Sequence, residues 1–105
     1  MRKPSVKCAL LAAMVAEHRW GSPIVEENLL SISAIDTDDY PTASDVFDEL
    51  RSEDYITAKG KRGIELNNSQ FGALADVLYY ECEWEPYEIR SRLKHYEGWD
   101  DHEWT

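Results

Sequence analysis

The chain has 105 residues, 43% of them hydrophobic, which is enough for one domain with a modest core and argues against a disordered protein. Acidic residues outnumber basic residues by 21 to 11, so the net charge is −10, whereas a DNA-binding domain is normally basic. The acids are dispersed along the chain, which favours adaptation to high salt in a halophilic cell. The alternative is that the protein binds no nucleic acid.

The longest apolar run, residues 8–16, is too short to cross a membrane. Glu17 to Trp20, which follow it, do not form a small-residue cleavage site, so the run is not read as a signal peptide. We therefore expect a cytoplasmic protein without a membrane segment. Cys8 and Cys82 lack any paired-cysteine spacing, which favours two free thiols in a reducing compartment over a disulfide.

Apolar residues at steps of three and four predict a first helix that is capped by Ser5 and ends near residue 17. A second helix is expected from Ser22, with a proline in its first turn, to between residues 32 and 35. A polar turn over residues 36–39 leads to a third helix that begins at residue 41 or 42. Its inward positions are predicted to be Ala43, Val46, Phe47 and Leu50.

Two short strands, residues 55–58 and 64–67, flank a basic turn with Gly60 and Gly63, and this pattern predicts a β-hairpin. A fourth helix follows, with an apolar stripe that ends at Cys82. Pro86 then starts a fifth helix that stops at Gly98. The sequence from residue 99 onward is an acidic tail.

Three helices, a basic hairpin and further helices, in this order, resemble the winged helix-turn-helix superfamily of small prokaryotic regulators. Residues 44–66 carry the resemblance: a helix that ends in Leu50-Arg51, acidic residues 53 and 54, Tyr55 at the start of the strand, and two glycines in the wing. The acidic composition is similar to that of a haloarchaeal member. In that family the break at residues 19–23 often adds a short strand to the hairpin edge.

The resemblance implies an α+β, mostly helical fold. Residues 1–67 would form a winged helix-turn-helix core, residues 68–98 a helical extension of the same domain, and residues 99–105 the tail. It also implies that the third helix lies in the major groove of double-stranded DNA while the wing contacts phosphates. The nucleic-acid-binding residues implied in this way are Thr42, Ser44, Arg51, Lys59, Lys61 and Arg62.

Two observations bear on that implication in opposite directions. Asp45, Asp48 and Glu49 share the outward face of the third helix, and their carboxylates repel phosphates, so base contact and a plain solvated surface are equally supported there. The basic turn of the hairpin is a better signal, although charged hairpin tips also serve solubility.

Aromatic residues crowd the C-terminal third, where they either complete the core or form the interface of a homodimer that matches two half-sites. We expect a mixture of both. The predicted interface residues are Trp84, Tyr87, Ile89, Leu93 and Trp99.

Other chemistry is not indicated. The sequence has no glycine-rich phosphate loop, nucleophile elbow or histidine–cysteine spacing of a metal site, so we expect neither an enzyme nor a bound metal or cofactor. Two functions stay open: a dimeric DNA-binding transcription regulator, or a non-enzymatic protein-interaction module that kept the fold and lost nucleic-acid binding.

Overall fold

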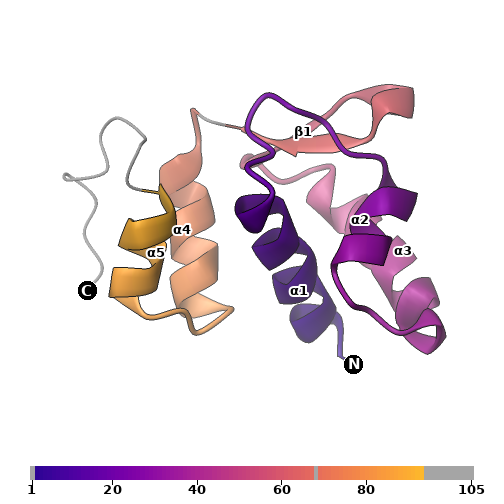
Figure 1. The fold of residues 1–105 in the computed structure, drawn as a ribbon, viewed down its shortest axis with the longest axis horizontal. Helices are drawn as coiled ribbons and strands as arrows, with labels where there is room; N and C mark the ends of the chain where they lie inside the picture. Colours follow the sequence, from indigo (N-terminus) through magenta and orange to yellow (C-terminus); the bar gives the residue numbers. More distant parts are fainter. Residues whose placement is uncertain (1, 68, 94–105) are drawn as a thin grey trace.

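Five helices and one two-stranded antiparallel sheet make up the part of the chain that the computed structural model describes, residues 2–67 and 69–93 (Figure 1). The mixed, mostly helical class is as predicted. The helices are α1 (Lys3–Ala16), α2 (Glu26–Ile32), α3 (Tyr40–Leu50), α4 (Phe71–Tyr80) and α5 (Pro86–Leu93). The strands are β1 (Ile56–Ala58) and β2 (Ile64–Leu66), and the short 3-10 helices are η1 (Thr37–Asp39) and η2 (Gly60–Arg62).

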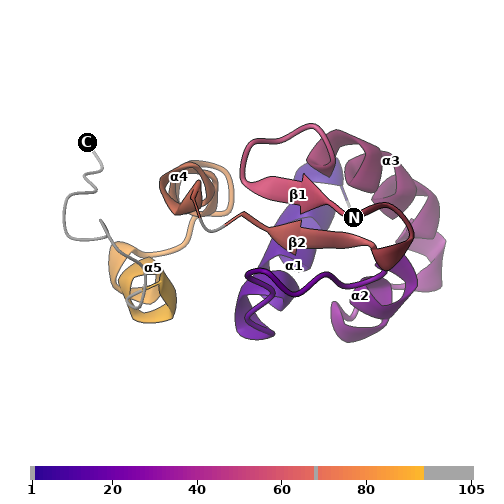
Figure 2. The ribbon, with the colours of Figure 1, turned by 90° about the horizontal axis from the view of Figure 1, so that it is seen from above.

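Helix α1 runs through the middle of the fold, between α2 and α3 on one side and α4 and α5 on the other (Figure 2). It begins at Lys3, before the predicted start, because Pro4 lacks an N–H and fits the first turn of a helix. Ser5 therefore does not cap it. The chain leaves the helix after Ala16 and turns at His18, whose φ of 54° is in the left-handed region.

The start of α2 differs from the prediction. Ile24 exchanges two backbone hydrogen bonds with Ile64 of β2, at 2.9 and 3.0 Å, and Trp20 bridges to Leu66. Residues 20–24 therefore run along the edge of the hairpin with an isolated bridge at each end and a bend at Gly21, in place of the short strand expected at the break, and α2 begins only at Glu26. Pairing with the distant strand overrides the local helix-start signal of Ser22 and the proline after it.

Helix α3 and the hairpin follow the sequence pattern closely. The four predicted inward residues of α3 are all buried. In the hairpin, Ile56 pairs with Leu66 and Ala58 with Ile64. Gly60 and Gly63 have the positive φ values that the turn requires, 59° and 100°.

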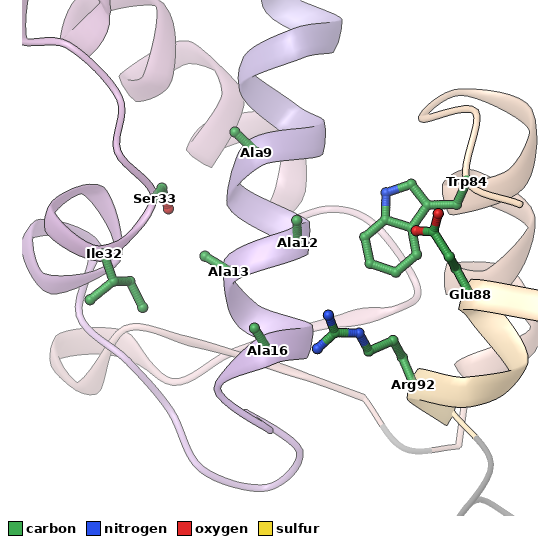
Figure 3. A pocket seen from close by; sticks show the side chains of 9 residues that line it. All are labelled: Ala9, Ala12, Ala13, Ala16, Ile32, Ser33, Trp84, Glu88 and Arg92. Carbon is green, nitrogen blue, oxygen red and sulfur yellow. The ribbon is translucent and has the colours of Figure 1, made fainter.

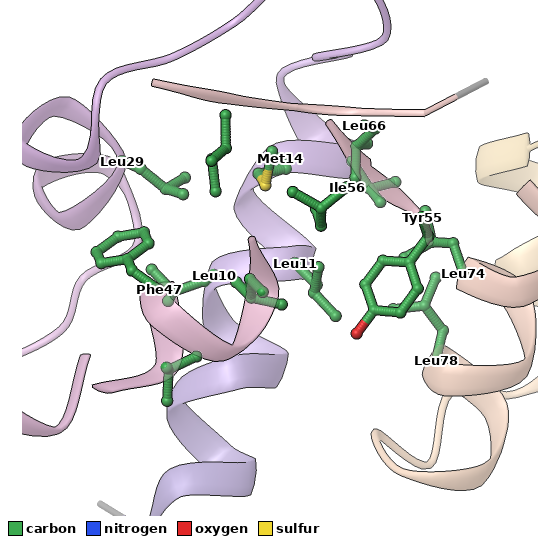
Figure 4. Close-up of a cluster of buried hydrophobic side chains, with 14 of the residues drawn as sticks. Leu10, Leu11, Met14, Leu29, Phe47, Tyr55, Ile56, Leu66, Leu74 and Leu78 are labelled. Carbon is green, nitrogen blue, oxygen red and sulfur yellow. The ribbon is translucent and has the colours of Figure 1, made fainter. Parts of the chain in front are cut away.

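One hydrophobic cluster joins all five helices and both strands (Figure 4). It extends from Leu29 and Phe47 on one side of α1 to Leu74 and Leu78 of α4 on the other. The core side chains of α5, Ile89 and Leu93, also have no exposed surface. Helices α4 and α5 therefore enlarge the same core that α1, α3 and the hairpin form.

The prediction of two free thiols is wrong. Cys8 of α1 and Cys82, two residues beyond α4, form a disulfide with their Cα atoms 5.5 Å apart. Their separation of 74 residues hides this pairing from a sequence argument.

No helix within residues 2–67 and 69–93 combines the length and apolar character that crossing a bilayer needs.

Candidate nucleic-acid interface

The outward face of α3 mixes one hydroxyl with carboxylates. At about 100° per residue, Ser44, Asp45 and Asp48 point away from the four buried positions, and all three are exposed. Thr42 lies at the border of the buried face and is only half exposed. Of the two predicted contacts near the start of the helix, Ser44 is therefore the accessible one, and it lies beside acidic neighbours.

Arg51, at the C-terminal end of α3, is held by two carboxylates of the same chain. One terminal nitrogen of its guanidinium donates to Asp48 Oδ1 at 2.6 Å, and the other forms an ion pair with Glu26 at the start of α2. A guanidinium has a fixed fork of donors. Contact with a phosphate or a guanine therefore requires Arg51 to leave these partners.

Lys59, at the base of the hairpin turn, is also paired. Its ammonium lies 3.3 Å from Glu65 Oε1 of β2. Glu65 is the one charged residue that is buried within the described part of the chain, and its other oxygen, Oε2, has no hydrogen-bond partner there. A buried carboxylate needs a compensating charge. Lys59 therefore stabilises the fold by pairing with Glu65, in addition to any contact that it makes with a ligand.

The tip of the hairpin differs from both of these sites. Lys61 and Arg62 lie in η2, are exposed, and form no ion pair with a carboxylate of residues 2–67 or 69–93. Of the three predicted wing cations, two are therefore free to contact an anion without first breaking a pair. The six predicted nucleic-acid residues thus divide into an available tip, an exposed hydroxyl at Ser44, and three that are partly shielded or engaged.

The predicted dimer-interface residues differ in how exposed their side chains are. Ile89 and Leu93 face the core of their own chain with no exposed surface, which corrects their assignment to an interface. Within Pro86–Leu93, the apolar stripe of α5 therefore packs against the core of its own chain. Trp84 is half buried against the core, whereas Tyr87 is 69% exposed. Trp99 lies outside the described residues.

A groove that the sequence argument missed runs across α1, between the end of α2 on one side and Trp84 and α5 on the other (Figure 3). Its volume is about 390 Å³. The floor is a row of alanines on α1, and Ile32 and Trp84 stand on opposite sides of it. The signal in the sequence is the spacing of these alanines, which repeat at three and four residues. The lining residues are Ala9, Ala12, Ala13, Ala16, Ile32, Ser33, Trp84, Glu88 and Arg92.

No group of three or more acidic, histidine or cysteine side chains in the described ranges has the arrangement of a metal site, the acidic turn at residues 36–39 included. His102 and its acidic neighbours lie outside those ranges.

The chain matches no protein-family model, no curated protein and no solved structure. The candidate interface is therefore supported only by its own geometry.

Proposed function

We propose that this chain is a DNA-binding regulator of the winged helix-turn-helix type, which holds duplex DNA mainly through the tip of its hairpin. The observation that carries the proposal is the exposure of Lys61 and Arg62 without a carboxylate partner among the described residues. Each phosphate that a cation neutralises adds affinity through release of counterions. The order of three helices and a hairpin with an added edge segment supports the same function.

In this proposal α3 contributes less than the tip. Ser44 can donate a hydrogen bond to a phosphate directly, because it is exposed. Arg51 contributes only when it exchanges Asp48 and Glu26 for the nucleic acid. Asp45 and Asp48 oppose the approach of phosphates, so the expected binding is weak and strongly dependent on salt.

The test is a titration of a short fluorescent DNA duplex of mixed sequence, followed by anisotropy across a series of KCl concentrations. Replacing both tip cations, Lys61→Ala with Arg62→Ala, should lower affinity at every salt concentration. It should also reduce the slope of log affinity against log salt by about 1.8, because each lost phosphate contact removes about 0.9.

The matched control removes two other cations that have no carboxylate partner within the described residues, Arg2→Ala with Arg90→Ala. Both are exposed, and they belong to the N-terminus and to α5, which lie away from the hairpin (Figure 1). The net charge therefore changes equally while the proposed contact stays. An equal loss of affinity in the two double variants would show general charge attraction and contradict the proposal.

The row of carboxylates on α3 favours a second candidate, a protein-interaction module that does not bind DNA. The variant Asp48→Asn separates the two. If α3 approaches DNA, removing this carboxylate frees Arg51 from one partner and raises DNA affinity. If neither the unmodified chain nor this variant binds the duplex at any salt concentration, the second candidate is supported.

We propose further that the net charge of −10 is an adaptation to high salt. In the described ranges, the carboxylates other than Glu65 lie on the surface, where their mutual repulsion is screened by ions. The urea midpoint of unfolding should then rise with KCl. A midpoint that stays constant or falls would contradict this explanation.

A further inference from the structure

Glu65 is an acidic residue at a place in the hairpin where little water reaches it. It belongs to β2, which lies between β1 and the edge segment of residues 20–24 (Figure 2). Its neighbours Ile64 and Leu66 belong to the core, so Glu65 points to the opposite face of the sheet. Its exposed fraction is nevertheless only 6%. A carboxylate at such a site needs a cation or hydrogen bonds to compensate its charge.

Lys59 is the ion-pair partner of Glu65 within residues 2–67 and 69–93. Its ammonium lies 3.3 Å from Oε1, whereas Oε2 is buried and has no hydrogen-bond partner in those ranges. Taking away the cation leaves a buried charge uncompensated, which costs far more than breaking an exposed pair. A phosphate that drew Lys59 away would have to offset this cost, whereas a phosphate that contacts Lys61 or Arg62 would not.

The ion pair also determines where the side chain of Lys59 points. Thr57 and Glu65 are cross-strand partners, so Glu65 lies one step further from the turn than Lys59 does. The ammonium of Lys59 is therefore directed back along β2. Lys61 and Arg62, in contrast, lie in η2 at the tip of the hairpin and are exposed.

We propose that Glu65 is a positioning residue that holds Lys59 away from DNA, so that the hairpin contacts phosphates with Lys61 and Arg62 alone. This role rests on the proposed function and adds a control of its strength. A buried carboxylate and the phosphates compete for one cation, and the carboxylate wins. Removing the charge of Glu65 frees Lys59 as a third phosphate contact.

Duplex binding across a series of KCl concentrations tests this role with Glu65→Gln and with the double variant Lys59→Ala, Glu65→Gln. Glu65→Gln should raise affinity at least about threefold at low salt and steepen the slope of log affinity against log salt by about 0.9, the value of one added phosphate contact. The double variant should return to the slope of the unmodified chain. Glu88→Gln, the same charge change at an exposed position of α5, should leave the slope unchanged. Thermal unfolding reports that each variant is folded.

A slope that does not change in Glu65→Gln would overturn the proposal. So would a gain in affinity that persists in the double variant, because the gain would then come from the lost carboxylate and not from Lys59.

A measurement without DNA separates a failure of this proposal from a failure of the proposed function. With a limiting amount of an amine-reactive reagent, followed by mass spectrometry, Lys59 should be modified at least about fivefold more slowly than Lys61, because the buried carboxylate holds its ammonium. Glu65→Gln should make the two rates similar. Equal rates in the unmodified chain would overturn the proposal even if the duplex binds. Slow modification that Glu65→Gln abolishes, with no duplex binding by any chain, would contradict the proposed function and support the hold of Glu65 on Lys59.

Discussion

Cys8 of α1 is joined by a disulfide to Cys82, just beyond α4, and the ion pair between Lys7 and Glu81, 3.0 Å long, lies beside it. Both links connect the same two elements. They fasten the pair α4–α5, which is last in the chain, to the helix that is first. A crosslink between such distant positions restricts the unfolded chain strongly, because it closes a long loop.

The first prediction concerns this crosslink. For a loop of this length, chain-entropy estimates give a stabilisation of about 4 kcal/mol as an upper value. Adding a reductant should therefore lower the free energy of unfolding in urea by up to about that amount. The double variant Cys8→Ala with Cys82→Ala should show a similar loss and no further response to the reductant. Equal urea midpoints with and without reductant would contradict the prediction.

The second prediction concerns alkaline pH. Burial lowers the pKa of Lys7, but the hydrogen bond that Lys7 donates to Glu81 and the electrostatic attraction of the Tyr55 side chain outweigh this, so the pKa lies above the ordinary 10.5. Burial raises the pKa of Tyr55 above 10.0, and the charge of Lys7 only partly opposes this. Both groups are thus more stable in their protonated forms when folded. Their contribution is complete below about pH 10 and is lost as the pH rises through the folded pKa values.

Urea unfolding measured at several pH values between about 8 and 11.5 checks this sign. The variant Tyr55→Phe should have nearly unchanged stability at neutral pH, because the buried hydroxyl has no hydrogen-bond partner within the described residues. It should lose stability less steeply in alkali, since one of the two titrating groups is gone. Stability that rises with pH in this range is the opposite of the expected result.

The third prediction compares two glycines of the hairpin turn. Both have positive φ, but a Cβ at Gly63 would lie 1.9 Å from the carbonyl oxygen of Ile24, whereas a Cβ at Gly60 would meet nothing within 4 Å. Gly60→Ala should cost about 1 kcal/mol for the backbone conformation alone. Gly63→Ala should cost at least about 3 kcal/mol, because residues 20–24 must also move away from β2. Thermal unfolding of both variants measures the difference.

Local sequence signals are sufficient to predict some parts of this fold and not others. The inward face of α3 and the glycines of the hairpin could be predicted, because helical spacing and turn conformation depend on neighbouring residues. The start of α2 could not, since Ile24 pairs with a strand forty residues later. The disulfide also depends on how α1 and α4 pack. The sequence predicts Arg51 as a nucleic-acid contact, but it does not show that Glu26 reaches Arg51 from another helix.

Lys59 is an intermediate case. Thr57 and Glu65 are cross-strand partners, so residue 59, two positions after Thr57, is a diagonal neighbour of residue 65 on the same face of the hairpin. A prediction that considered this diagonal contact would have paired Lys59 with Glu65. What the sequence does not show is that this carboxylate is buried. The pairing is therefore accessible to sequence reasoning, and its importance for the fold is not.

The fourth prediction tests whether α5 stabilises one chain or joins two. Ile89 is fully buried, so Ile89→Ala should lower the free energy of unfolding by about 2–5 kcal/mol through loss of core packing. Because the contact lies within one chain, the loss should not depend on protein concentration. Tyr87→Ala is the matched control on the same helix. Tyr87 is 69% exposed, and its removal should change stability by less than about 0.5 kcal/mol.

The dependence of stability on protein concentration distinguishes a dimer from a monomer in this pair of variants. If a homodimer uses the exposed side of α5, Tyr87→Ala should weaken association in sedimentation experiments while Ile89→Ala lowers the stability of each chain. If Ile89→Ala instead costs stability only at high protein concentration, its side chain contributes to association. The burial of α5 against the core of its own chain would then be contradicted.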